Sequence, residues 1–140
     1  MTKIPTRYRR FTDGISACLF AIALTATPAF AIDVPSGQPV ELQEVLVDEV
    51  DGQIWLRFRF VAPEIARDGG SIDNEAAAPD MIHLCTSVAL PYITQYDLDG
   101  QIIVVSLADR VTEFGVPDPD ATQFFEAFRA EGDTCIWEGL

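Results

Sequence analysis

The chain has 140 residues, of which 22 are acidic and nine are lysine or arginine, so its formal net charge is −13. Nucleic-acid-binding proteins gather basic residues on one face, and this chain has too few for such a face. The length allows one domain. With 49% hydrophobic and 22% charged residues, the composition is that of a folded protein and not of a disordered one.

The first 31 residues have the three parts of a secretory signal peptide. A basic start (Lys3, Arg7, Arg9 and Arg10) precedes an uncharged, mostly apolar run over residues 15–24. Ala29 and Ala31 then supply small residues at the two positions that a signal peptidase requires. We therefore expect cleavage after Ala31, a periplasmic or secreted protein, and no stable membrane anchor.

Three other interpretations of this segment are weaker. An uncleaved anchor would need ~20 apolar residues, and the run is shorter. A lipoprotein signal at Cys18 is disfavoured because the apolar run follows this cysteine instead of preceding it. Arg9-Arg10 suggests the twin-arginine route, but Phe11 is out of register with that motif.

Removal of the expected signal peptide changes the charge and the cysteine content. Residues 32–140 contain five arginines, no lysine and 21 acidic residues, a formal charge of −16. We interpret this acidity as adaptation to a saline compartment, since salt at 1 M shortens the Debye length to ~3 Å. Cys85 and Cys135 remain, and we expect them to form one disulfide in an exported domain, with a buried free pair as the alternative.

The N-terminal half predicts a β-hairpin. Residues 32–39 are expected to be an extended, loosely held leader to a single domain over residues 40–140. Residues 40–47 favour a strand, and Asp51-Gly52 is a strong turn signal. Residues 53–61 alternate, so Ile54, Leu56, Phe58 and Phe60 share one face, and Trp55, Arg57, Arg59 and Val61 share the other.

A loop is predicted next, over residues 63–79, and then a helix. Asp80 is expected to cap this helix and Pro91 to end it at Leu90. Its core-facing residues recur at helical spacing: Met81, Leu84, Cys85 and Val88. A buried strand is expected at residues 101–107, with an extension over residues 110–116 after a bend.

The C-terminal part predicts a second helix and a short last strand. Asp118-Pro119 is a helix-start signal, and Gly132 is a helix-stop signal. A stripe with helical spacing lies between them: Ala121, Phe124, Phe125 and Phe128. Residues 135–137 read as a strand. We therefore predict an α+β two-layer sandwich, with about four strands in one mainly antiparallel sheet and two helices on one face. The disulfide would tie the first helix to the last strand.

The arginines of the second strand are the most informative polar residues. Trp55, Arg57 and Arg59 share one face, and tryptophan with arginine is typical of binding hot spots. We take these three as candidate binding residues. The alternative is that the arginines pair with carboxylates on neighbouring strands.

No catalytic, metal or cofactor site is predicted. His83 and Ser87 lie one helical turn apart and could form a small hydrolase pair, but no nucleophile motif surrounds them. Acidic turns such as Asp97-Leu98-Asp99-Gly100 resemble only fragments of a calcium loop. One histidine and two disulfide cysteines do not build a structural zinc site, and no cofactor motif occurs.

Several segments resemble a family of small exported proteins of unknown function that we associate with marine alphaproteobacteria. They are the strand at residues 101–110, Glu113-Phe114-Gly115, residues 120–128, residues 135–138, and the region around His83-Leu84-Cys85 and Ala89-Leu90-Pro91. The resemblance covers most of residues 32–140. It implies an envelope location and no particular chemistry.

Together these features predict a non-enzymatic binding or accessory module with a protein partner in the cell envelope. One version is an inhibitor of a cationic cell-wall enzyme, because opposite fields steer association. A hydrolase that uses Ser87 and His83, or a calcium-stabilised structural domain, is the alternative from another class.

Overall fold

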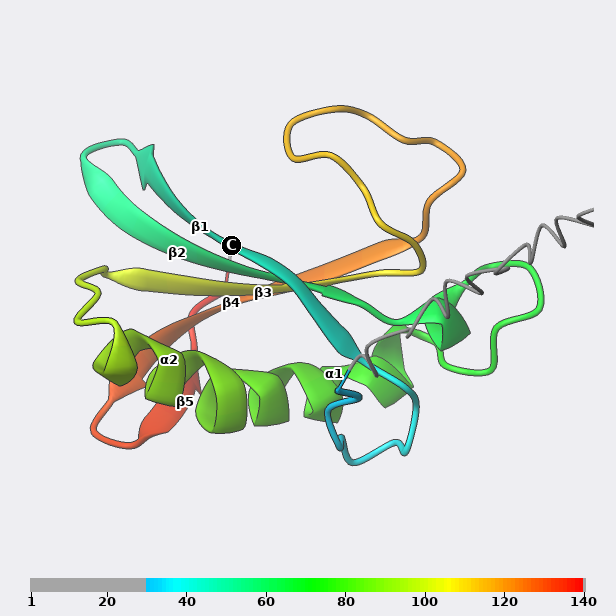
Figure 1. Cartoon of the computed structure of the whole chain (residues 1–140), viewed down its shortest axis with the longest axis horizontal. Coiled ribbons are helices and arrows are strands. Elements are labelled where there is room, and N and C mark those ends of the chain that lie inside the picture. Colours follow the sequence, from blue (N-terminus) through cyan, green and yellow to red (C-terminus); the bar gives the residue numbers. More distant parts are fainter. Residues whose placement is uncertain (1–29, 140) are drawn as a thin grey trace, which may run out of the picture.

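One mixed sheet of five strands and one long helix make up the fold of residues 30–139, the part of the chain that the computed structural model describes. The strands lie in the order in which they occur along the chain (Figure 1). Neighbouring strands are antiparallel except for β2 and β3, which are parallel. The strands are β1 (Glu41–Val50), β2 (Gln53–Val61), β3 (Ile102–Ala108), β4 (Gln123–Glu131) and β5 (Thr134–Trp137).

The predicted hairpin is confirmed. Asp51 and Gly52 connect β1 to β2 with positive φ angles of 50° and 78°, as tight hairpin turns require. The alternation in β2 is also as predicted, because Leu56, Phe58 and Phe60 are almost fully buried. These three side chains belong to the main core between the sheet and the helix.

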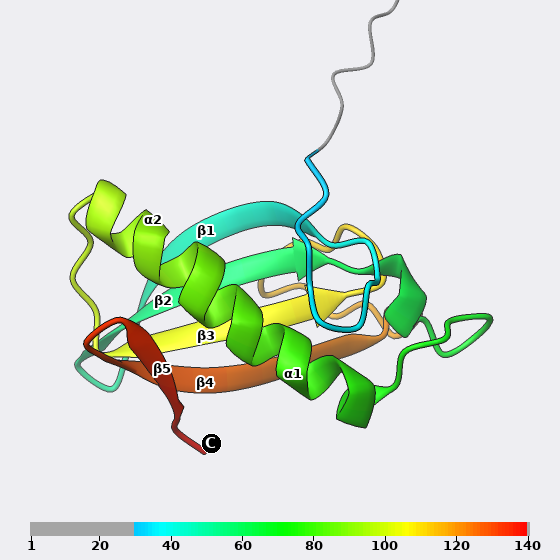
Figure 2. The same cartoon turned by 90° about the horizontal axis from the view of Figure 1, so that it is seen from below.

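A single helix of 22 residues covers one face of the sheet and crosses its strands obliquely (Figure 2). It consists of α1 (Asn74–Leu84), the π-helical turn η2 (Cys85–Ala89) and α2 (Leu90–Gln95). The predicted helix is therefore real but longer at both ends. The buried stripe includes Met81, Leu84 and Cys85, as the spacing indicated.

Both predicted helix ends were wrong. Asp73, not Asp80, caps the helix, and its carboxylate accepts a hydrogen bond from the backbone N–H of Ala76 at 2.9 Å. Pro91 does not end the helix, because the π-helical turn precedes it and the N–H of Leu90 bonds to the carbonyl of Cys85. A π turn widens the helix locally and so relieves the clash that a proline ring creates with the preceding turn.

Residues 118–132 do not form the predicted second helix. Most of this segment is β4, in which Phe124 and Phe128 turn towards the helix and Phe125 points away from it. Aromatic residues favour strands, and pairing with β3 outweighs the helical spacing of the phenylalanines. Residues 110–116 are likewise not a strand extension but part of a loop. The α+β class is correct, whereas the sheet has five strands and the helix layer has one helix.

Residues 32–39, expected to be a loosely held leader, pack against the helix. Asp80 lies fully buried in α1, and its carboxylate accepts hydrogen bonds from the Ser36 backbone N–H (2.8 Å), the Ser36 hydroxyl (2.6 Å) and the Gln38 amide (2.7 Å). A buried carboxylate needs such donors, because desolvation without them is costly. The expected signal peptide, with cleavage after Ala31, lies almost entirely in residues 1–29, outside the described part of the chain.

The expected disulfide joins Cys85, in the π-helical turn, to Cys135 in β5. It therefore ties the helix to the last strand across a sequence separation of 50 residues. The short terminal strand is held by this bond in addition to its pairing with β4.

Candidate ligand cavity

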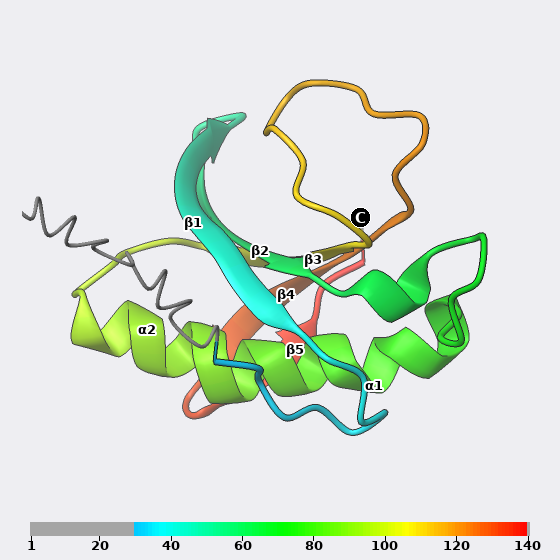
Figure 3. The same cartoon turned by 45° about the vertical axis from the view of Figure 1, so that its right-hand side comes forward.

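A cavity of about 420 Å³ lies on the sheet face opposite the helix. The loop over residues 109–122 connects β3 to β4 and rises on this side, as does the far end of the β1–β2 hairpin (Figures 1 and 3). Side chains from β1, β2, β3, β4 and this loop line the cavity. The loop therefore adds a wall to a sheet face that would otherwise be open.

The two ends of the loop are fastened together. The backbone N–H of Asp109 bonds to the carbonyl of Thr122 at 3.0 Å, and the Asp109 carboxylate accepts from the backbone N–H of Thr122 at 2.9 Å. The same carboxylate accepts from the guanidinium of Arg110 at 2.9 Å. These contacts, chiefly the one with Arg110, hold the pKa of Asp109 below its usual value. The neck of the loop is thus closed by one backbone hydrogen bond and by contacts to the Asp109 carboxylate that favour its ionised form.

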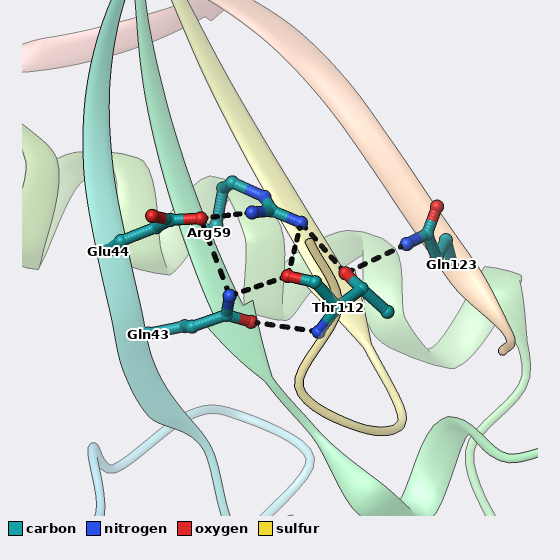
Figure 4. A network of polar contacts seen from close by, with 5 residues as sticks. All are labelled: Gln43, Glu44, Arg59, Thr112 and Gln123. Carbon is teal, nitrogen blue, oxygen red and sulfur yellow. Dashed lines mark hydrogen bonds and ion pairs between the residues drawn. The ribbon is translucent and has the colours of Figure 1, made fainter. Parts of the chain in front are cut away.

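A buried polar network fixes the start of the loop to the sheet (Figure 4). Arg59 of β2 is 8% exposed, pairs with Glu44 of β1, and donates from Nη2 to the Thr112 hydroxyl (2.7 Å) and carbonyl (3.1 Å). Gln43 also donates to the Thr112 carbonyl, at 2.8 Å, and Gln123 donates to the Thr112 hydroxyl, at 3.2 Å. Thr112 is thereby held from three strands, which positions the following residues over the sheet.

Arg57 lies at the side of the cavity. Its Nε donates to Asp48 of β1 at 2.9 Å, and its guanidinium lies over the rings of Trp55 and Phe114, 5.2 and 5.3 Å from the ring centroids. Arg59 also lies over the Phe114 ring, at 5.6 Å. Cation–π attraction to a loop phenylalanine therefore adds to the polar network in holding the loop over β2.

The floor and rim of the cavity are largely apolar. Val104 of β3 is buried at the floor beside Ser106, whose hydroxyl makes no hydrogen bond to any residue in the described part of the chain. At the rim, Phe114, Val116 and Phe125 are 47%, 52% and 60% exposed. This combination of apolar walls with a few polar groups is the usual composition of a small-ligand site.

The structure places the three predicted binding residues on one face but gives them different roles. Arg57 and Arg59 line the cavity, whereas Trp55 lies next to it and packs against the buried residues Ile102, Val104 and Ala127. The arginines do pair with carboxylates of β1, as the alternative held, and for Arg59 these contacts are structural. Sequence reasoning missed Thr112 and Phe114. The available signal was a phenylalanine and two valines within a polar, glycine- and proline-containing segment.

His83 and Ser87 do not interact as a nucleophile and a base. The Ser87 hydroxyl donates to the backbone carbonyl of His83 at 2.6 Å, one helical turn away, so its proton is engaged with the helix itself. Both residues are exposed on the side of the helix that faces away from the sheet.

Residues 30–139 contain neither a metal-binding cluster nor a membrane-spanning helix. No group of three or more histidine, cysteine, aspartate or glutamate side chains lies in a metal-holding arrangement there. No helix in that range has the length and apolar character needed to cross a membrane.

The fold and the cavity define a small α+β protein with one sheet face covered by a helix and the other walled by a loop. The chain belongs to a family of unknown function (DUF6497), whose model matches residues 17–140. No curated protein and no solved structure matches the chain. The expected membership of a family of unknown function is thus confirmed, while export and a marine alphaproteobacterial origin stay predictions.

Proposed function

We propose that this protein is an exported, non-enzymatic binding module that contacts a protein partner in the cell envelope through the sheet face around Arg57. The observation that carries the proposal is the cavity between the sheet and loop 109–122, because hydrogen bonds hold the loop over the sheet and apolar side chains remain exposed at the cavity rim. A preformed apolar surface of this kind is typical of binding sites.

The composition of this face supports recognition of a protein. Trp55, Arg57, Phe114 and Phe125 lie on it or line the cavity, and aromatic residues and arginine dominate the binding energy of protein interfaces. Arg59 supports the surface from beneath, since it is buried and both its terminal nitrogens are engaged, by Glu44 and Thr112. We therefore assign contact with the partner to Arg57 and the aromatic rim, and a positioning role to Arg59.

The proposed location rests on the N-terminal pattern and on the disulfide, which is typical of oxidising compartments. Four acidic residues lie on β1, at the edge of the sheet: Glu41, Glu44, Asp48 and Glu49. Arg59 and Arg57 pair with Glu44 and Asp48, so the net negative charge of this strand comes from the exposed Glu41 and Glu49. Their field would attract a basic partner, which favours the version in which the partner is a cationic cell-wall enzyme.

Site-specific photo-cross-linking in living cells tests the proposal. A photoreactive amino acid at position 125, on the cavity rim, should form one dominant adduct, and the same group at Thr86, exposed on the helix, should not. R57A should reduce the adduct at least fivefold, whereas R129A, a change of equal charge on β4 away from the cavity, should leave it intact. Equal adducts at both positions, or an adduct unaffected by R57A, would exclude this surface.

The inhibitor version has its own assay. The purified protein should inhibit a basic lysozyme at low salt, and the inhibition should weaken as salt screens the charges. Absence of inhibition at low salt would remove this version and leave the binding surface to be judged by the cross-linking.

A further inference from the structure

Arg57 has hydrogen-bonding capacity that the fold does not use. Only its Nε is engaged, by Asp48, and neither terminal nitrogen donates to any group within residues 30–139. The cation–π contacts with Trp55 and Phe114 hold the guanidinium in place without occupying its donors. Two parallel N–H donors held in one plane match the two oxygens of a carboxylate.

The charges around the cavity limit what kind of anion fits. Asp48 already neutralises part of the Arg57 charge, Glu44 pairs with Arg59, and Glu113 lines the same cavity. A dianion such as a phosphate monoester would place a second negative charge beside these carboxylates, with no further cation among the described residues lining the cavity to balance it. A single carboxylate needs only the two unused donors of Arg57.

The remaining walls suit an apolar group. The side chains that line the rest of the cavity are partly polar, and the apolar ones include Val104, Phe114, Val116, Pro117 and Phe125. Its volume of about 420 Å³ falls in the range of small-ligand sites. The Ser106 hydroxyl, which bonds to no residue within 30–139, offers one further polar contact on the floor.

We infer that this cavity binds an apolar group carrying a single carboxylate, supplied either by a small free acid or by the C-terminal residue of a protein chain. The inference rests on the proposed binding function and specifies the chemistry that its site recognises.

Trp55 provides the readout. The chain has two tryptophans, and Trp137 is exposed on β5. In the full-length W137F variant, tryptophan fluorescence therefore comes from Trp55 alone. Titration with 4-phenylbutyrate should change this fluorescence saturably. The neutral analogue 4-phenylbutyramide should bind about tenfold more weakly, a difference of about 1.4 kcal/mol.

Variants assign the preference to Arg57. R57Q should abolish the difference between acid and amide, whereas R129Q should retain it because Arg129 does not line the cavity. S106L, which fills the floor of the cavity, should weaken the binding of both the acid and the amide. This variant keeps the test decisive if R57Q unfolds. Circular dichroism verifies the fold of each variant.

A second pair of probes distinguishes the sources of the carboxylate. Acetyl-Ala-Phe with a free carboxyl group is compared with its C-terminal amide. Tighter binding of this peptide acid than of 4-phenylbutyrate identifies a chain end, and the reverse identifies a small acid.

Equal affinity for acid and amide, or no saturable change with any probe, would overturn the inference. In that case a persisting cross-link at position 125 would leave the proposed function standing. Binding of the acids without any cross-linked partner would support the inferred ligand chemistry and count against the proposed contact with a protein partner.

Discussion

Replacement of Thr112 by valine tests whether the buried network holds the loop. Valine has nearly the shape of threonine but lacks the hydroxyl, so Arg59 Nη2 loses its 2.7 Å acceptor and keeps only the Thr112 carbonyl at 3.1 Å. Hydrogen bonds to charged groups contribute ~1.5–3 kcal/mol. Gln123 is exposed and finds water instead, so its lost bond adds little.

We expect T112V to lower the free energy of unfolding by about 2 kcal/mol, which is a large fraction of a small domain's stability. Urea unfolding followed by circular dichroism measures this change, with the slope against urea unaltered. V111T is the matched control, because Val111 is 72% exposed and its replacement should change stability by less than ~0.5 kcal/mol.

A double-mutant cycle with R59M isolates the interaction. In the R59M protein no guanidinium remains, so T112V should then cost less than ~0.5 kcal/mol. If T112V has the same cost with and without Arg59, or no cost in the native background, the network does not hold the loop and our reasoning is refuted.

Three further predictions concern the anchors of the fold. D80A should lower the free energy of unfolding by about 3 kcal/mol and expose residues 32–39 to proteolysis, because three donors to a buried carboxylate lose their acceptor; unchanged proteolysis would show that this anchor is dispensable. Reduction of the Cys85–Cys135 disulfide should lower stability by about 4 kcal/mol in urea unfolding, and a loss below ~1 kcal/mol would contradict a role in restricting the unfolded chain. The lowered pKa of Asp109 stabilises the fold above its unfolded pKa, and this contribution disappears as the pH falls through the folded pKa. D109N should therefore be less stable than the native protein at pH 7, with a gap that narrows by about pH 3; a gap that is constant with pH would argue against an ionised Asp109 at the loop neck.

The elements with one dominant local signal were predictable. The alternation of β2 and the Asp-Gly turn are set by neighbours in the sequence, and both proved correct. The phenylalanines of β4 fit a helix and a strand equally well, because Phe124 and Phe128 are four residues apart and therefore share a face in both. Pairing with β3, which no local pattern reveals, decides between them.

The candidate site was only half visible in the sequence for a similar reason. Alternation places Arg57 and Arg59 together, since they lie two residues apart on one strand. Thr112 lies 53 residues from Arg59, and only the fold brings its hydroxyl to the guanidinium. The distinction between a structural arginine and a ligand-binding one also depends on burial, which for these two residues follows from the position of the loop.

The parallel pairing of β2 with β3 divides the sheet into two parts with different folding requirements. On one side β1 pairs with β2, and on the other side β3, β4 and β5 pair in sequence order, so both parts close over shorter stretches of chain than the β2–β3 pairing does. The seam between them closes only after the whole helix has been spanned, and contacts of such sequence separation slow folding. We therefore expect the β1–β2 part and the β3–β4–β5 part to form early. The pairing of β2 with β3, with the helix packed across them, should then set the folding rate.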